Sequence, residues 1–238
     1  MLRIALDAGH WYGEPGRRCL KKFDKNETRE WTLNSRVIEY VEDGLKDYTG
    51  YEYIRVDDRT GKKNVSLAQR VKLANDFKAD VFLSVHHNAG IKGGKGGGIV
   101  VYRYPNSTKF TKAMQKALYN ELIRHTGLKG NRASPLAEAN FAILRNSKMA
   151  AVLIENGFMD SKTDVPIILS DAHARKTARG IVAWLAAEYR LKAKPKPAPK
   201  PAGYYRVIVG SYKDKNNAIA QQNKLKKAGF DSFLSYYE

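Results

Sequence analysis

The stretch Val81-Phe82-Leu83-Ser84-Val85-His86 is almost continuously apolar and ends in a histidine. Such a run, without polar alternation, is typical of a strand buried on both faces of a parallel or mixed sheet. Four further segments are strand candidates, and several of them are equally apolar; they are residues 3–7, 51–56, 98–102 and 150–154. We therefore expect a central sheet built from these segments.

Helical patterns occupy the intervals between the strand candidates. The first repeats an apolar residue at every fourth position, at Leu33, Val37, Val41 and Leu45. Ser66 and Gln69 have the spacing of a capping box, which predicts that a helix begins there. Two more amphipathic stretches cover residues 110–122 and 171–189. Alternating strands and helices predict an α/β fold, with a twisted, mostly parallel sheet and helices on both faces.

A segment rich in lysine and proline divides the chain. Residues 194–201 have proline at every second position, with lysine or, once, alanine between, which excludes helix and sheet interior and predicts a stiff polyproline II spacer. We expect a main domain at residues 1–191, a linker at 192–203 and a small C-terminal module at 204–238.

The C-terminal module has the pattern of one βαβ-like unit. Strands are expected at residues 204–209 and 232–236, on either side of a helix at 216–228 that Gly229 ends. A unit of this size buries little core by itself, so we expect it to pair with something.

Charge and cysteine content limit the possible functions. The net charge of +18 favours a polyanionic partner, such as nucleic acid, an anionic membrane or an anionic cell wall. Cys19 is the only cysteine, which excludes an internal disulfide and a cysteine-rich zinc site.

The sequence carries neither a membrane span nor a recognisable secretory signal. No apolar run approaches the roughly 20 residues that cross a bilayer, so no membrane insertion is expected. The first apolar stretch is short and is interrupted by Asp7. The protein is thus expected to be synthesised in the cytoplasm without a signal peptide and to leave by another route.

Three of the strand candidates are followed, directly or within three residues, by a residue that can bind a metal or catalyse hydrolysis. These residues are His10, His86 and Glu155. If the strands are parallel, their carboxyl ends meet at the edge where open α/β sheets place their sites. Two histidines and a carboxylate match a catalytic zinc site, which has three protein ligands and an open position for water. A further acid can then serve as base to that water.

Other candidate motifs are weaker. His87, His125 and His173 are expected to have structural or solvated roles. In an extended strand His87 points to the opposite side from His86, and the other two lie at helix ends. No Gly-x-Ser-x-Gly occurs, which disfavours a serine hydrolase. The glycine-rich residues 91–98 lack the Ser or Thr that follows the lysine of a phosphate-binding loop, so they are expected to form a flexible loop beside the site.

Four motifs occur in order along residues 1–190 and together carry a family resemblance. They are Asp7-Ala8-Gly9-His10, then Arg29-Glu30 with Asn34, then Ser84-Val85-His86-His87-Asn88-Ala89, then Val152-Leu153-Ile154-Glu155-Asn156-Gly157-Phe158. This combination resembles the type 3 N-acetylmuramoyl-L-alanine amidases of bacterial autolysins and phage endolysins. The family often has proline where this chain has Ala8, which changes loop stiffness but no ligand.

The resemblance implies a role for each matching residue. His10, Glu30 and His86 would bind Zn²⁺, and residues 1–191 would form the catalytic domain. Glu155 would act as general base on water and then pass the proton to the departing amine. Burial beside apolar residues is expected to raise the pKa of Glu155 towards the working range.

Three acidic or polar residues near these motifs have open roles. Glu27 lies three residues before Glu30, so it is an alternative zinc ligand, although Glu30 opens the helical pattern. Asp7 and Asn88 flank the expected ligands. They are expected either to orient them or to serve simple turn and loop-end roles.

The tail carries a second resemblance. Tyr204-Tyr205-Arg206-Val207-Ile208-Val209-Gly210-Ser211-Tyr212, followed by Gly229-Phe230, resembles half of a sporulation-related (SPOR) repeat, which binds peptidoglycan glycan strands. Because only one half is visible, we expect two chains to pair their tails in a homodimer. The tail aromatics could stack on nucleic-acid bases, but the amidase resemblance favours sugar rings, and no nucleic-acid partner is expected.

The resulting hypothesis is a zinc-dependent peptidoglycan hydrolase that cuts the amide bond between N-acetylmuramic acid and L-alanine. Two alternatives remain at this point: a zinc hydrolase of another amide, and a non-catalytic basic protein that binds cell wall or nucleic acid. Release through a phage holin or by mother-cell lysis would both bring the protein to its substrate. The compact layout slightly favours the endolysin.

Overall fold

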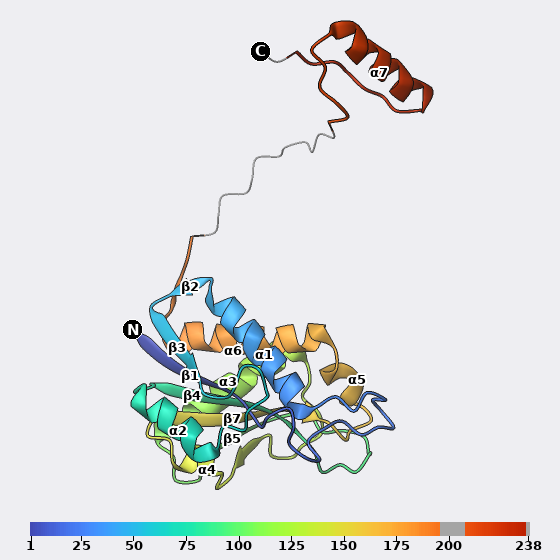
Figure 1. Cartoon of the computed structure of the whole chain (residues 1–238). Helices are drawn as coiled ribbons and strands as arrows, with labels where there is room; N and C mark the ends of the chain where they lie inside the picture. Colours follow the sequence, from blue (N-terminus) through green and yellow to red (C-terminus); the bar gives the residue numbers. More distant parts are fainter. Residues whose placement is uncertain (196–207, 237–238) are drawn as a thin grey trace. The chain divides into compact units, whose positions relative to one another are not determined.

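The computed structural model describes residues 1–195 and 208–236 and divides into two compact units, Met1–Lys194 and Pro195–Glu238 (Figure 1). Within the described residues, no helix is both long and apolar enough to cross a membrane.

The first unit is built on a six-stranded sheet with the order β3-β1-β4-β7-β5-β6. All neighbouring strands are parallel except β5 and β7, so the predicted mostly parallel sheet is confirmed. Because β1, β4 and β7 are neighbours and run parallel, their carboxyl ends lie together at one edge of the sheet. The strands are β1 Leu2–Ala8, β3 Tyr51–Arg55, β4 Val81–Asn88, β5 Ile99–Arg103, β6 Leu136–Glu138 and β7 Ala150–Phe158.

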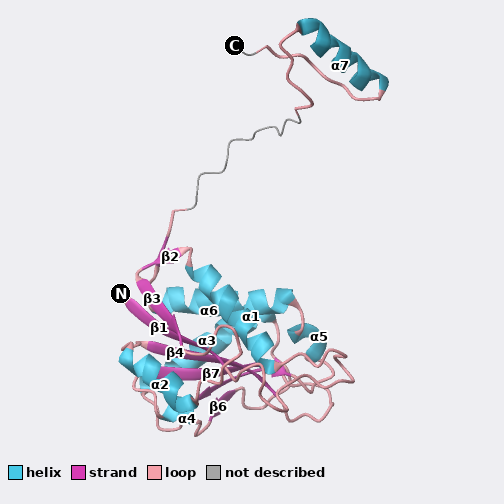
Figure 2. Cartoon of the chain, viewed as in Figure 1, coloured by secondary structure: helices cyan, strands magenta, loops and turns pink. Residues whose placement is uncertain are grey.

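Helices cover both faces of this sheet (Figure 2). Apolar residues of α1, α3 and α6 join the larger hydrophobic cluster on one face. Residues of α2 and α4 join the smaller cluster on the other face. The helices are α1 Glu30–Leu45, α2 Leu67–Asp76, α3 Lys109–Thr126, α4 Ala142–Arg145, α5 Val165–Ile168 and α6 Asp171–Glu188.

Strand β4 shows why its sequence lacks alternation. Val81, Leu83 and Val85 belong to the larger cluster, whereas Phe82 belongs to the smaller one. Because both faces of the strand pack against apolar side chains, polar residues are excluded from both. The predicted capping box is also present at the start of α2, where the Gln69 N–H donates to Ser66 Oγ and the Ser66 N–H donates to Gln69 Oε1.

The first unit extends beyond its last helix. Strand β8, Lys192–Ala193, pairs antiparallel with β2, Tyr48–Thr49. The first residues of the expected linker therefore pack on the main domain, whereas the rest of that linker lies mostly outside the described residues.

In the second unit the predicted helix is confirmed as α7, Lys215–Lys227, which Asp214 caps by accepting two backbone N–H groups. The expected strand at 232–236 is wrong, because these residues adopt no strand pairing. Residues 204–207 of the other expected strand lie outside the described residues, and 208–209 are not in a strand. A strand requires a neighbour for its backbone hydrogen bonds, and none of α7 is buried to anchor one.

Candidate metal centre

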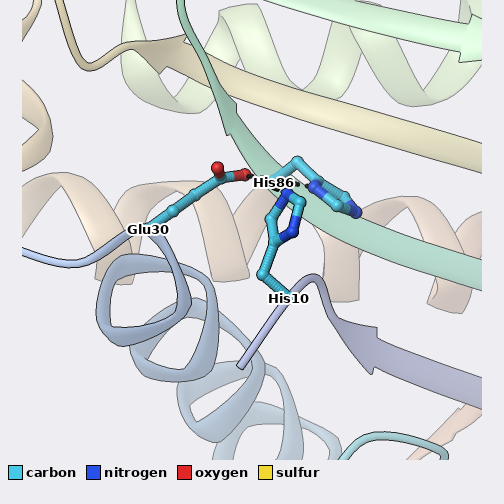
Figure 3. Close-up of side chains that lie close together, drawn as sticks. All are labelled: His10, Glu30 and His86. Atoms are coloured by element: carbon cyan, nitrogen blue, oxygen red, sulfur yellow. Dashed lines mark hydrogen bonds and ion pairs between the residues drawn. The ribbon is translucent and has the colours of Figure 1, made fainter. Parts of the chain in front are cut away.

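Three separate elements bring His10, Glu30 and His86 to one point (Figure 3). His10 follows β1, Glu30 is the first residue of α1, and His86 lies near the end of β4. One potential ligand atom from each side chain lies within 4.8 Å of those of the other two. The parallel pairing of β1 with β4 brings the two histidines together, as the sequence predicted.

Glu30 lies at the centre of this cluster and is almost completely buried. Its Oε1 accepts the His87 N–H at 3.2 Å and lies 3.1 Å from His86 Nδ1 and 3.3 Å from His10 Nε2. Burial opposes ionisation, but the contacts with His10 and His86 outweigh it and hold the pKa of Glu30 well below its usual range. Glu30 is therefore an anion in a buried site.

The donor set fits a metal ion. Glu30 Oε2 is buried and has no hydrogen-bond partner, a costly state for a carboxylate oxygen unless something else neutralises it. Two imidazoles and a carboxylate are the ligands that catalytic zinc sites use, with a further position left open. A cation between these side chains would satisfy the orphaned oxygen.

The backbone conformation at His10 is unusual and is stabilised by hydrogen bonds from Arg70. Its φ of 66° lies in the left-handed region, which non-glycine residues rarely adopt. Arg70 donates to the carbonyl oxygens of His10 at 2.6 Å and Ala8 at 2.8 Å. Asp7 is paired with the same guanidinium at 2.6 Å. Asp7 thus contacts no cluster side chain directly but supports the His10 turn through Arg70.

Glu14 is a functional candidate that the sequence reasoning missed. Its Oε2 lies 2.9 Å from His10 Nδ1, on the side of the ring opposite Glu30. Burial lowers the pKa of His10, but the hydrogen bonds and charges of Glu30 and Glu14 outweigh it and raise that pKa. A carboxylate on the far nitrogen fixes the tautomer and orientation of a ligating histidine. The only signal in the sequence was that Glu14 lies four residues after His10. Both residues lie in a loop, where this spacing does not predict a contact.

His87 has the structural role expected for it. Its ring is buried between Asn34 Oδ1 at 2.7 Å and Asn156 Nδ2 at 3.2 Å. Burial lowers its pKa to about 3, so the ring stays neutral. The Asn156 Oδ1 in turn accepts from Thr177 of α6. This buried network fixes the end of β4 against α1, β7 and α6, and it also positions His86.

Two other residues considered near the site lie outside the cluster. Asn88, the last residue of β4, accepts the N–H of Ala89 with its own side chain, which matches the loop-end role considered for it. Glu27 precedes α1 and lies 3.5 Å from Arg18 in an ion pair, outside the cluster. The three-residue spacing therefore does not place Glu27 on the helical face of Glu30.

Glu155 lies beside the cluster on β7, where it is the register partner of His86. The side chain keeps some exposure, but its Oε2 is enclosed and has no hydrogen-bond partner. Burial, and then the charge of Glu30, raises the pKa of Glu155 well above its usual range, against an opposing effect of Arg17. A carboxyl with a raised pKa beside a candidate metal-binding cluster has the properties of a proton-transfer group.

Comparison with known proteins identifies the family. The model of the family described as N-acetylmuramoyl-L-alanine amidase matches residues 4–187, which contain the whole cluster and all of the sheet except the first two residues of β1. The chain belongs to the N-acetylmuramoyl-L-alanine amidase family. It is therefore an enzyme that acts on peptidoglycan, and the non-catalytic alternative is no longer favoured.

Individual relatives agree with this assignment. The chain is 31% identical to a sporulation-specific N-acetylmuramoyl-L-alanine amidase of Bacillus subtilis, over 98% of this chain and 84% of that one. It is 30% identical to an endolysin of Bacillus phage SPP1, over 87% and 75% of the two chains. The crystal structure of an amidase from Clostridium difficile 630 superposes with a TM-score of 0.70 at 25% identity, covering 79% of this chain and 97% of that one.

A SPOR domain model matches residues 174–236 and overlaps the amidase match along α6. The structure assigns α6 to the amidase unit, because Ala178, Ile181 and Leu185 are buried in its larger hydrophobic cluster. Within the described residues, the part of the SPOR match that lies in the second unit consists of α7 and its flanking segments.

Gly9 provides a test of the amidase site. A Cβ at this position would lie 2.1 to 2.5 Å from three atoms of the His86 ring. We expect Gly9→Ala to push the ring aside and to weaken zinc binding by about 10- to 100-fold, measured by competition with a chelator of known affinity. Gly50→Ala is the control, because Gly50 also resists substitution, with a φ of 89°, but has open space around it. Equal zinc affinity in the two variants would show that the Gly9 contact does not position His86.

Proposed function

We propose that this amidase is a zinc enzyme and that His10, Glu30 and His86 hold the ion. The observation that carries the proposal is the convergence of two imidazoles on a buried, ionised Glu30 whose second carboxylate oxygen has no partner. The His10 ring presents Nε2 to the cluster while Nδ1 faces Glu14. Zinc in such a site supplies Lewis acidity, which polarises a scissile carbonyl and makes water more nucleophilic.

We further propose that Glu155 is the general base. Its position beside His86 brings a carboxyl to the edge of the cluster, and a pKa raised by burial suits a group that takes up and then releases a proton. Glu155 would take the proton from the attacking water as oxygen bonds to the lactyl carbonyl carbon. It would return that proton to the nitrogen of L-alanine as the carbon–nitrogen bond breaks.

The experiment that tests this function is a digest of purified peptidoglycan with zinc measured in the same preparation. We expect turbidity to fall, new alanine amino termini to appear and no new reducing sugar ends to form, with about one zinc per chain. New reducing ends would indicate a glycosidase. New amino termini other than alanine would indicate cleavage of another amide.

The biological role that we propose is cell-wall lysis. Relatives with the names of a sporulation amidase and a phage endolysin support both settings about equally. The net charge of +18 suits an anionic wall polymer in either case.

The second unit is proposed to bind the wall as a homodimer. In support, α7 buries no residue, while Phe230 and Phe233 beside it are 64% and 73% exposed. Exposed apolar side chains on so small a unit favour association with a second copy. Sedimentation of the full chain should give about twice the monomer mass at high concentration, and a variant truncated after residue 194 should stay monomeric. Equal masses for both proteins would contradict the proposal.

A further inference from the structure

An aromatic hollow is lined by residues that follow two of the proposed zinc ligands in the chain. It has a volume of about 610 Å³, and Trp11, Tyr12 and Trp31 are among its lining residues. Trp11 and Tyr12 follow His10 in the chain, and Trp31 follows Glu30. The hollow is thus joined to the cluster through two peptide bonds, although no cluster side chain lines it.

The hollow is preformed, because its rings are held from several sides. Tyr12 and Trp31 meet edge to face, with ring centroids 6.4 Å apart and an interplanar angle of 84°. The backbone of Gly61 packs so closely on Trp31 that a Cβ there would lie 2.7 Å from the indole ring. The Tyr12 N–H donates to the Gly61 carbonyl oxygen at 3.0 Å, which ties the two walls of the hollow together.

The wall that contains Gly61 is itself fixed by Asp58. This carboxylate accepts the N–H groups of Lys62 and Lys63, both at 2.9 Å, and the hydroxyl of Thr60 at 2.6 Å. These hydrogen bonds lower the pKa of Asp58 to about 2, so it remains ionised and keeps the turn closed. Because this surface is already ordered, ligand binding loses little conformational entropy.

The chemistry of the lining matches a sugar ring. Tyr12 is 56% exposed although it is large and aromatic. Aromatic side chains offer a broad apolar surface with a polar edge, while a pyranose has an apolar face of C–H groups and a rim of hydroxyls. Thr60 and Lys62, which also line the hollow, offer hydrogen-bond groups to such a rim. Lys62 forms no ion pair in the described part of the chain that would occupy its ammonium.

A second hollow, which shares Tyr12 and Thr32 with the first, has the opposite character. Its volume is about 420 Å³, and its lining includes Arg18, Asn26, Glu27 and Arg29. The substrate of this amidase also has two unlike halves, a sugar and a peptide, joined at the bond that is cut. The charged hollow resembles the peptide in polarity, and the aromatic hollow resembles the sugar.

We propose that the hollow of Trp11, Tyr12 and Trp31 binds a pyranose ring of the glycan strand and so positions the muramoyl amide at the cluster. This inference rests on the proposed function, since it assigns one half of that substrate to one surface. The hollow fixes which way the substrate lies across the site, with its sugar on the side of the residues that follow His10 and Glu30.

The first test compares two substrates that share the scissile amide. One is a GlcNAc-MurNAc-peptide, and the other is the matching D-lactoyl-L-alanyl peptide, which lacks the sugars. We expect the wild type to have a higher kcat/KM on the first, and Tyr12→Ala to lower the ratio of the two values about tenfold. Phe110→Ala, which removes an aromatic ring that is 47% exposed on α3, is the control and should keep the wild-type ratio. If Tyr12→Ala lowers kcat/KM for both substrates equally, the hollow does not bind the sugar, and the proposal fails.

The second test measures binding without catalysis. Chitotetraose contains no scissile amide, and the fluorescence of the three tryptophans reports on the first unit alone, because all three lie within Met1–Lys194. Trp184 is only 2% exposed, so a change in emission reports on Trp11 and Trp31. We expect saturable binding that Tyr12→Ala weakens about tenfold and that Phe110→Ala leaves intact.

The two tests separate this inference from the proposed function. If muramoyl peptides are cleaved but chitotetraose causes no change in emission, the amidase mechanism stands and the sugar site is overturned. If chitotetraose binds through Tyr12 but no substrate is cleaved, the sugar site stands and the proposed catalytic site fails.

Discussion

Glu155→Gln is expected to lower the kcat of peptidoglycan cleavage by about 10³-fold while zinc stays bound. Glutamine has the same shape as glutamate, so the packing around β7 should be unchanged, but its amide cannot take a proton from water. Glu155 lies outside the group of three converging side chains, so the metal should be retained. The measurements are released alanine amino termini and zinc content for both proteins.

The control for this prediction is Glu52→Gln, which makes the same change at the partly exposed partner of Arg3. It should keep full activity, because an exposed ion pair contributes little. Loss of zinc from Glu155→Gln would mean that Glu155 is a ligand and not the base. Retained activity would mean that another group transfers the proton.

Glu30→Ala is expected to remove both zinc and activity. Glu30 is the only carboxylate of the three converging side chains, and without it the two imidazoles lose the negative charge that attracts a cation. Its loss also leaves the His87 N–H without its acceptor. Glu30→Gln keeps that acceptor and the side-chain volume, so it separates loss of the charge from loss of the fold. Zinc per chain and circular dichroism check both variants.

Glu27→Ala is the matched control, because Glu27 lies three residues away and pairs with Arg18 on a partly exposed part of the surface. It should keep zinc and activity. The outcome that contradicts the assignment is the reverse pattern, in which Glu27→Ala loses zinc and Glu30→Ala keeps it.

The sheet could be predicted from the sequence because a strand buried on both faces requires consecutive apolar residues. Val81, Phe82 and Leu83 must all be apolar when helices cover both sides of β4. The same reasoning failed for residues 232–236, because whether an apolar segment becomes a strand depends on a neighbour that can accept its hydrogen bonds. Propensity within the segment carries no information about that neighbour.

The sequence by itself determined the α/β alternation and the candidates His10, His86 and Glu155 near the carboxyl ends of strands. The expected strand ends were too early, because β4 continues to Asn88 and β7 to Phe158. These features follow from local patterns, since strands and helices have short periods and parallel strands end at one edge. Glu30 entered the candidate set only through the family resemblance. The sequence alone left Glu27 as an alternative to Glu30.

Only the tertiary structure decided how loops and helix ends meet around the cluster. The pairing of Glu14 with His10, the close approach of Gly9 to His86 and the aromatic hollow of Tyr12 and Trp31 all join segments whose separation in space depends on the path of loops. Loop paths are set by many weak contacts over long sequence distances, such as the hydrogen bonds of Arg70 to the turn at His10. For that reason the candidate ligands are visible in the sequence, whereas the surroundings that orient them and receive the substrate are not.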